Sequence, residues 1–180
     1  MEAIDKVRDT STSHERCSII EVMGRNAGYI ALWCGIANGA EDILLPERYD
    51  GNEQALIDRI IENRKRGKKH NIIINAEGIG HSTSMARRIE AATGIETRAT
   101  ILGHMQRGGS PCPYDRVLST RLGSEAAQLI LDKQYGYMVG MVNGKVKKIP
   151  LGECAGKLKT VDPNAQEVLQ AKRMGISFGD

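Results

Sequence analysis

Strand-like and helix-like segments alternate along most of this chain, and that alternation most limits its fold. The most apolar strand pattern is NIIINA at residues 71–76. It lies between helix patterns at residues 52–65 and 82–93, the second of which starts in a Ser/Thr cluster and stops at Gly94. Such alternation predicts a parallel sheet with helices packed on its faces. We therefore expect an α/β fold of Rossmann-like type, with a mainly parallel sheet flanked by helices.

The other predicted elements follow the same logic. The remaining predicted strands are residues 17–23, 42–45 and 97–102, and the remaining predicted helices are residues 26–35, 113–133 and 164–174. Asn143-Gly144, between strand patterns at residues 137–142 and 145–149, predicts a hairpin turn. Residues 2–7 resemble the end of a helix without its own N-cap and lead into a Ser/Thr loop, so we expect the chain to be a truncation.

Composition excludes several classes of protein. The chain has 180 residues, of which 41% are hydrophobic and 26% charged, as in ordinary globular proteins. No apolar run approaches the roughly 20 residues of a membrane span, and no signal peptide is evident, so we expect a cytoplasmic protein without membrane contact. A net charge of +3 with 4% aromatic residues argues against nucleic-acid binding. Four cysteines without CxxC or Cys/His spacing predict neither disulfides nor zinc.

Three predicted strand ends carry candidate binding residues, because ligands of such sheets bind beyond the carboxyl ends of the strands. After residues 17–23, Gly24, Arg25 and Gly28 would suit a phosphate at a helix start. A tight strand-to-helix turn would need the same glycines, and both interpretations stay open. After residues 71–76, Glu77 lies in a Gly-containing loop where its carboxylate could accept bonds from sugar hydroxyls, although a lone GxG is weak evidence.

The third strand end favours function over structure. His104, Met105, Gln106 and Arg107 precede Gly108-Gly109, and Arg98 lies in the strand before them. Arginine offers two parallel hydrogen bonds to phosphate oxygens, and paired glycines let the backbone approach a ligand closely. A purely structural turn would need neither His nor Arg.

Two further observations concern charge and missing motifs. The basic run at residues 64–70 is, on composition alone, a solvated face. The chain contains no GxxxxGK[ST] loop, no protein-kinase signature and no acidic pair typical of a magnesium-nucleotide site. Its own residues therefore indicate a phosphosugar or phosphate binder without a nucleotide site.

Longer motifs show a family resemblance. The stretches are DTSTSHER at residues 9–16, EVMGRNAG at 21–28, GKKH at 67–70, ETRATILGHMQRGGSP at 96–111 and PYDR at 113–116. Their order and spacing resemble the C-terminal part of bacterial ATP-dependent 6-phosphofructokinases over essentially the whole chain. The family's N-terminal nucleotide loop and its TIDND-like segment with the aspartate base have no counterpart in these 180 residues.

The resemblance implies a sugar-phosphate site. Its residues would be Arg16, Met23, Gly24, Arg25, Glu77, Arg98, His104, Met105, Gln106 and Arg107. Arg98, His104 and Arg107 would hold the 6-phosphate of fructose 6-phosphate, and Arg25 would stabilise charge on the transferring phosphoryl group. Arg16 and Arg98 would reach into a neighbouring subunit's site, so we expect a homo-oligomer, typically a tetramer.

The resemblance also implies part of an allosteric pocket for ADP or phosphoenolpyruvate. Its residues would be Arg8, Gly39, Ala40, Glu41, Arg66, Lys68, Lys69 and His70. Glu41, with the carbonyl of Gly39, would hold the magnesium ion of ADP.

For the whole enzyme, the resemblance implies phosphoryl transfer from Mg-ATP to the 1-hydroxyl of fructose 6-phosphate, which gives fructose 1,6-bisphosphate in glycolysis. The isolated chain would be inactive without the base and the nucleotide loop. A pyrophosphate-dependent phosphofructokinase and a non-catalytic sensor of sugar phosphates or nucleotides remain the alternatives.

Overall fold

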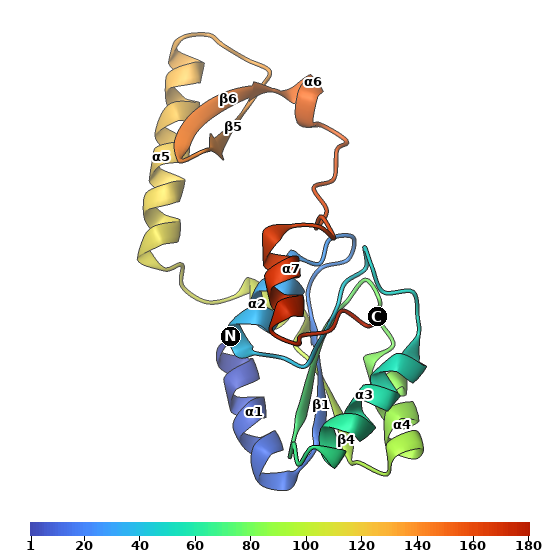
Figure 1. Ribbon diagram of the computed structural model, residues 1–180. Helices are drawn as coiled ribbons and strands as arrows, with labels where there is room; N and C mark the ends of the chain where they lie inside the picture. Colours follow the sequence, from blue (N-terminus) through green and yellow to red (C-terminus); the bar gives the residue numbers. More distant parts are fainter. The chain divides into compact units, whose positions relative to one another are not determined.

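The computed structural model describes residues 1–180, which form two compact units: Met1–Arg107 with Lys159–Asp180, and Gly108–Leu158. The first unit is built on a four-stranded sheet in the order β2-β3-β1-β4, with every neighbouring pair parallel (Figure 1). Its strands are β1 (Cys17–Val22), β2 (Asp42–Leu44), β3 (Asn71–Ala76) and β4 (Thr97–Ile101). The α/β class predicted from the sequence is confirmed.

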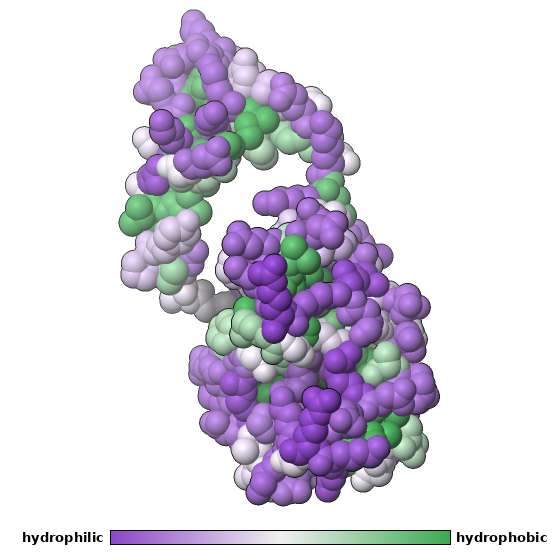
Figure 2. Space-filling model, in the orientation of Figure 1, coloured by the Kyte–Doolittle hydropathy of each residue, from purple (hydrophilic) through white to green (hydrophobic).

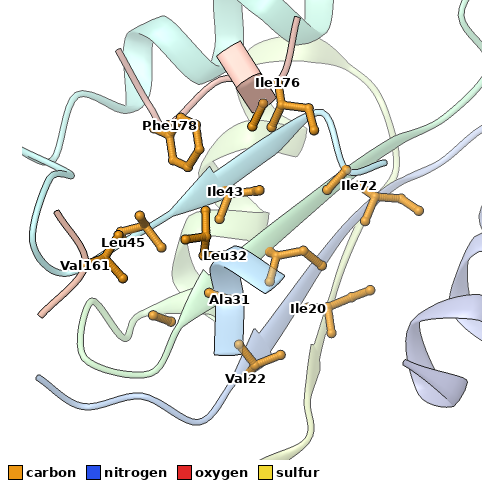
Figure 3. Packing of buried hydrophobic residues seen from close by; sticks show 14 of the residues in the cluster. Ile20, Val22, Ala31, Leu32, Ile43, Leu45, Ile72, Val161, Ile176 and Phe178 are labelled. Atoms are coloured by element: carbon orange, nitrogen blue, oxygen red, sulfur yellow. The ribbon is translucent and has the colours of Figure 1, made fainter. Parts of the chain in front are cut away.

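Helices cover both faces of this sheet. Three pack on one face, namely α1 (Glu2–His14), α2 (Tyr29–Asn38) and α7 (Gln166–Arg173), and two on the other, namely α3 (Glu53–Lys65) and α4 (Ser82–Thr93). Alternate residues of a strand point to opposite faces. Ile20 therefore joins the cluster under α1, α2 and α7 (Figure 3), and Ile19 joins the cluster under α3 and α4.

The connections diverge at the middle of the sheet. β1 leads through α2 on one face to β2, whereas the adjacent β3 leads through α4 on the opposite face to β4. Such a divergence opens a crevice beyond the carboxyl ends of the two strands, where open α/β sheets bind ligands.

The first helix is longer than the sequence predicted. α1 continues through the Ser/Thr stretch to His14 and ends at Glu15, whose φ is 53°. The hydroxyls of Thr12 and Ser13 donate to main-chain oxygens one turn back, so they are satisfied within the helix. The predicted loop was therefore wrong.

The last residues form a contact that the sequence did not indicate. Ser177 continues the sheet beside β2: Ile43 N donates to Ser177 O at 2.8 Å, and Ser177 N donates to Glu41 O at 3.0 Å. Phe178 is fully buried in the cluster under α2 (Figure 3). This segment protects the edge of β2 from solvent.

The second unit comprises α5 (Pro113–Leu131), an antiparallel hairpin of β5 (Tyr137–Val142) and β6 (Lys145–Pro150), and the short α6 (Leu151–Cys154). Asn143 and Gly144 both have positive φ, as the predicted hairpin turn requires. Only Leu129 is buried in this unit, and large side chains such as Tyr114 and Leu131 are exposed. Figure 2 shows hydrophobic residues at the surface of this unit. None of the chain's helices combines the length and the apolar character needed to cross a membrane.

The buried carboxylate of Asp42 predicts a pH effect on stability. Burial raises its pKa to about 6, although Arg59, whose Nε lies 3.1 Å from Oδ1, opposes that rise. The pKa of Asp42 is higher in the folded than in the unfolded protein, so the stability that comes from protonated Asp42 is complete below about pH 4. That stability is lost as the pH rises through about 6. Asn cannot titrate, so Asp42→Asn should gain on the order of 2 kcal/mol relative to wild type across this window.

Urea unfolding between pH 4 and pH 7 measures this difference. Asp9→Asn, at an exposed position of α1, is the control and should follow the wild-type curve. A wild-type curve parallel to that of Asp42→Asn would contradict the prediction.

Candidate functional site

Three loops meet at the carboxyl edge of the sheet, because β1, β3 and β4 are parallel and adjacent. The loop after β1 contacts both of the others. Gly24 N donates to Glu77 Oε1 at 3.2 Å, after β3, and Met23 N donates to Gln106 Oε1 at 3.4 Å. Gln106 belongs to the 3₁₀ turn η1 (Gly103–Arg107), where the sequence predicted an irregular loop. The structure thus brings most of the predicted sugar-phosphate residues together.

Two glycines permit the close approach of the first two loops. Gly24 has a φ of 138°, which side-chain-bearing residues rarely adopt. Gly78 N donates to Gly24 O at 3.1 Å, and a Cβ atom on Gly78 would lie 1.8 Å from Arg25 O. Both glycines are therefore required by the contact between the loops.

The same edge carries cationic and polar side chains without protein partners. Arg25, His104 and Arg107 are exposed, and none forms a side-chain hydrogen bond or an ion pair within residues 1–180. Met105 lies beside them on η1, with 76% of its surface exposed. An anion could bind these groups without breaking an existing ion pair. Phosphate esters fit such donors, and the Glu77 carboxylate adds an acceptor for hydroxyl groups.

Arg16 and Arg98 lie at the opposite, amino edge of the sheet. Both bind Glu96: Arg16 Nε lies 2.6 Å from Oε2, and Arg98 Nη2 lies 2.6 Å from Oε1. Hydrogen bonds from Arg16 and then Arg98 lower the pKa of Glu96. A cavity of about 290 Å³ lies beside the two arginines. Within one chain, therefore, Arg98 does not join His104 and Arg107 around a single phosphate.

Most of the residues implied for the effector pocket line a second cavity, of about 500 Å³. They are Gly39, Ala40, Glu41, Arg66 and Lys68. Its cations are paired with acids: Lys68 Nζ lies 2.6 Å from Glu41 Oε1, and Arg66 Nε lies 3.0 Å from Glu62 Oε1. An anion entering this cavity would compete with those carboxylates.

The other three implied effector residues do not line this cavity. His70 lies 3.2 Å from the hydroxyl of Thr12, and Lys69 Nζ lies 3.8 Å from Glu15 Oε1. The Nε of Arg8, on α1, is buried without a partner. These residues gather near the C-terminal half of α1 instead.

The arrangement of Glu41 does not fit a metal ion. Its Oε1 binds Lys68 and its Oε2 accepts from Ile72 N, so both oxygens are engaged. No group of three or more His, Cys, Asp or Glu side chains in the chain is placed to hold a metal.

Sequence reasoning misplaced the start of α2 and missed several site residues. The helix predicted from Asn26 begins at Tyr29, because residues 24–28 form the turn, and Glu47 already accepts from Gly28 N at 3.0 Å. Glu96, Arg59 and Met174–Ile176 also line or support the cavities but were not predicted. Only Glu96, two residues before Arg98 and just ahead of β4, had a local signal.

Fold and edge together define an α/β protein with unpaired Arg and His side chains beyond the carboxyl ends of its parallel strands. A family model described as Phosphofructokinase matches residues 1–130. The chain therefore belongs to the phosphofructokinase family.

Individual relatives agree with this assignment. The chain is 51% identical over 168 residues to an ATP-dependent 6-phosphofructokinase of Bacillus velezensis, which covers 93% of this chain and 52% of that protein. It is 47% identical to ATP-dependent 6-phosphofructokinase 3 of Bacteroides thetaiotaomicron, over 99% of this chain and 54% of that one. A structure of phosphofructokinase from Saccharomyces cerevisiae matches with a TM-score of 0.74 and 32% identity, over 95% of this chain and 23% of that one. The chain thus spans about half the length of the curated relatives it matches.

The contact between the first two loops can be tested at Gly78. In Gly78→Ala the new methyl group would overlap Arg25 O, so the free energy of unfolding should fall by about 1–3 kcal/mol. Gly123→Ala is the control, because its Cβ meets nothing within 4 Å and its helical position favours Ala by about 0.5–1 kcal/mol. Chemical denaturation compares the two. Equal stability of Gly78→Ala and wild type would show that the loops are not in contact.

Proposed function

We propose that this chain is the sugar-phosphate-binding, C-terminal part of an ATP-dependent 6-phosphofructokinase. The observation that carries the proposal is the carboxyl edge. Three loops are joined there by the Gly24–Glu77 and Met23–Gln106 hydrogen bonds, beside the unpaired side chains of Arg25, His104 and Arg107. The half-length match to relatives named for this activity supports it.

Each group at this edge has a chemical task in the proposal. Arg107 and His104 bind the 6-phosphate of fructose 6-phosphate, and Glu77 with the backbone of Met23 and Gly24 binds the sugar. Arg25 stabilises charge on the phosphoryl group as it moves to the 1-hydroxyl. The base that takes the hydroxyl proton, and the Mg-ATP site, belong to a part of the enzyme outside this chain. The chain's share of catalysis is positioning.

Arg16 and Arg98 serve a neighbouring subunit in this proposal. The strand β4 separates Arg98 from η1, and Arg98 is exposed at the amino edge of the sheet. Glu96 holds both arginines in place. A site completed by such groups requires a homo-oligomer, and we propose a tetramer.

The cavity of about 500 Å³ is proposed as part of a regulatory site for ADP or phosphoenolpyruvate. Its paired cations imply that an effector phosphate displaces Glu62 from Arg66 and competes with Glu41 for Lys68. The alternative function, a non-catalytic sensor, would use the same two sites without turnover.

Titration calorimetry with fructose 6-phosphate tests the substrate site. Arg107→Ala should cost about 1.5–3 kcal/mol of binding free energy, because a charge-assisted hydrogen bond to phosphate is lost. Arg87→Ala is the matched control, since Arg87 is exposed on α4 and has no ion-pair partner. Equal affinities of wild type and Arg107→Ala would refute the assignment.

The regulatory cavity is tested by titration with ADP. Arg66→Ala should weaken binding by about tenfold, because Arg66 lines the cavity and offers a phosphate two donors. Arg64→Ala, which removes an arginine outside the lining, should bind as wild type does. If both variants lose affinity equally, the effect comes from net charge and not from the cavity.

A further inference from the structure

A polar cluster lies beneath the loop that carries Glu77. Asn75 and Ser82 are 0% and 1% exposed, and they flank that loop at the end of β3 and the start of α4. Asn75 pairs in register with Glu21 of β1, and both project to the α3 and α4 face. Ser82 Oγ lies 2.5 Å from Glu21 Oε2 and 2.8 Å from Asn75 Nδ2.

Only one assignment of donors and acceptors satisfies the hydrogen bonds of this cluster. An ionised carboxylate only accepts, so the single hydroxyl proton of Ser82 is donated to Glu21. Ser82 Oγ must then accept from Asn75 Nδ2. The second N–H of that amide donates to Gly80 O at 3.1 Å. Asn75 therefore ties both the loop, through Gly80, and the helix start, through Ser82.

Packing does not account for these residues. Their neighbours on this face are apolar, including Ile19, Ile73 and Met85. Polar groups placed among such side chains are costly, and Asn75 Oδ1 is buried here without a partner, so a hydrophobic residue would pack with less risk. The hydrogen bonds instead connect these residues to the loop that carries Glu77.

The loop between these anchors is short. Its entry is fixed because Glu77 N donates to Val22 O at 2.8 Å, and its exit is fixed by the bonds to Gly80 and Ser82. Only Gly78 and Ile79 lie between, and Gly78 N is itself bonded to Gly24 O. A shift of the exit would therefore move the Glu77 carboxylate away from Gly24 N.

We propose that Glu21, Asn75 and Ser82 are positioning residues that hold Glu77 against Gly24 N in the geometry that receives a sugar hydroxyl. The sugar as ligand rests on the proposed function, whereas the hold on Glu77 does not. None of the three touches the ligand; they act through Gly80 and the helix start.

The amide proton of Gly24 reports directly on its hydrogen bond to Glu77. Its NMR chemical shift in wild type and in Glu77→Gln defines the bonded and the weakened state. Ser82→Ala should move it most of the way to the Glu77→Gln value, and Asn75→Asp, which removes both amide donors, should do the same. Ser82→Thr keeps a hydroxyl and should restore much of the wild-type shift.

Ser18→Ala is the matched control. Ser18 is 3% exposed, lies on the other face of β1 and bonds a single hydroxyl, that of Ser11. Ser18→Ala should lower the free energy of unfolding about as much as Ser82→Ala does, but it should leave the Gly24 amide shift unchanged. An unchanged Gly24 shift in folded Ser82→Ala would overturn the proposal. So would a Ser82→Ala chain that no longer folds, because the cluster would then support the core and not the loop.

A fructose 6-phosphate titration separates this proposal from the proposed function. Ser82→Ala should weaken affinity by roughly three- to tenfold, and the loss should vanish in a Glu77→Gln background. If the affinity losses of Ser82→Ala and Glu77→Gln add in the double variant, Ser82 does not act through Glu77 and the proposal is overturned. Absence of binding by the wild-type chain would count against the proposed function alone, and the Gly24 shift would still decide the hold.

Discussion

The parallel pairing of β1 with β3 is the constraint on which the rest of the first unit depends. It extends over six residue pairs, from Cys17 and Asn71 to Val22 and Ala76, at the centre of the sheet. The pairing sets the two strand ends side by side, so the loops with Gly24 and Glu77 must meet. It also places Glu21 beside Asn75 on one face. A register shift of one residue would turn a side chain such as Glu21 to the opposite face.

The two edges of the sheet differ in how their charges are compensated. At the carboxyl edge Arg25, His104 and Arg107 have no protein partners, so an anion would meet no competing carboxylate on these side chains. At the amino edge, the single carboxylate of Glu96 is shared by the two arginines, and Glu41 pairs with Lys68. An anion there must compete with a carboxylate already in place, at close range and in partly buried surroundings. This difference favours the carboxyl edge over the amino edge as the place where this chain binds an anion by itself.

Local sequence patterns predicted the parts of the fold that local physics determines. The strand at residues 71–76 and the helix at residues 82–93 were predicted with the bounds observed, because an unbroken apolar run and a terminal glycine specify them. The Ser/Thr stretch of α1 was misread, since its hydroxyls bond within the helix. The burial of Phe178 and the pairing of Ser177 with β2 join residues distant in sequence and leave no local pattern. The carboxyl-edge residues were predictable from strand order, whereas Glu47 and Arg59 act through contacts that only the tertiary structure creates.

The central claim is that this chain recognises a sugar phosphate with the loops beyond β1, β3 and β4. The most direct measurement is the change in backbone amide chemical shifts when fructose 6-phosphate is added to the ¹⁵N-labelled chain. The account predicts shifts that saturate and gather at residues 23–25, 77–80 and 103–107, with little change around Glu41 and Lys68. Shifts centred on the amino edge, or none in a chain that is folded, would contradict it.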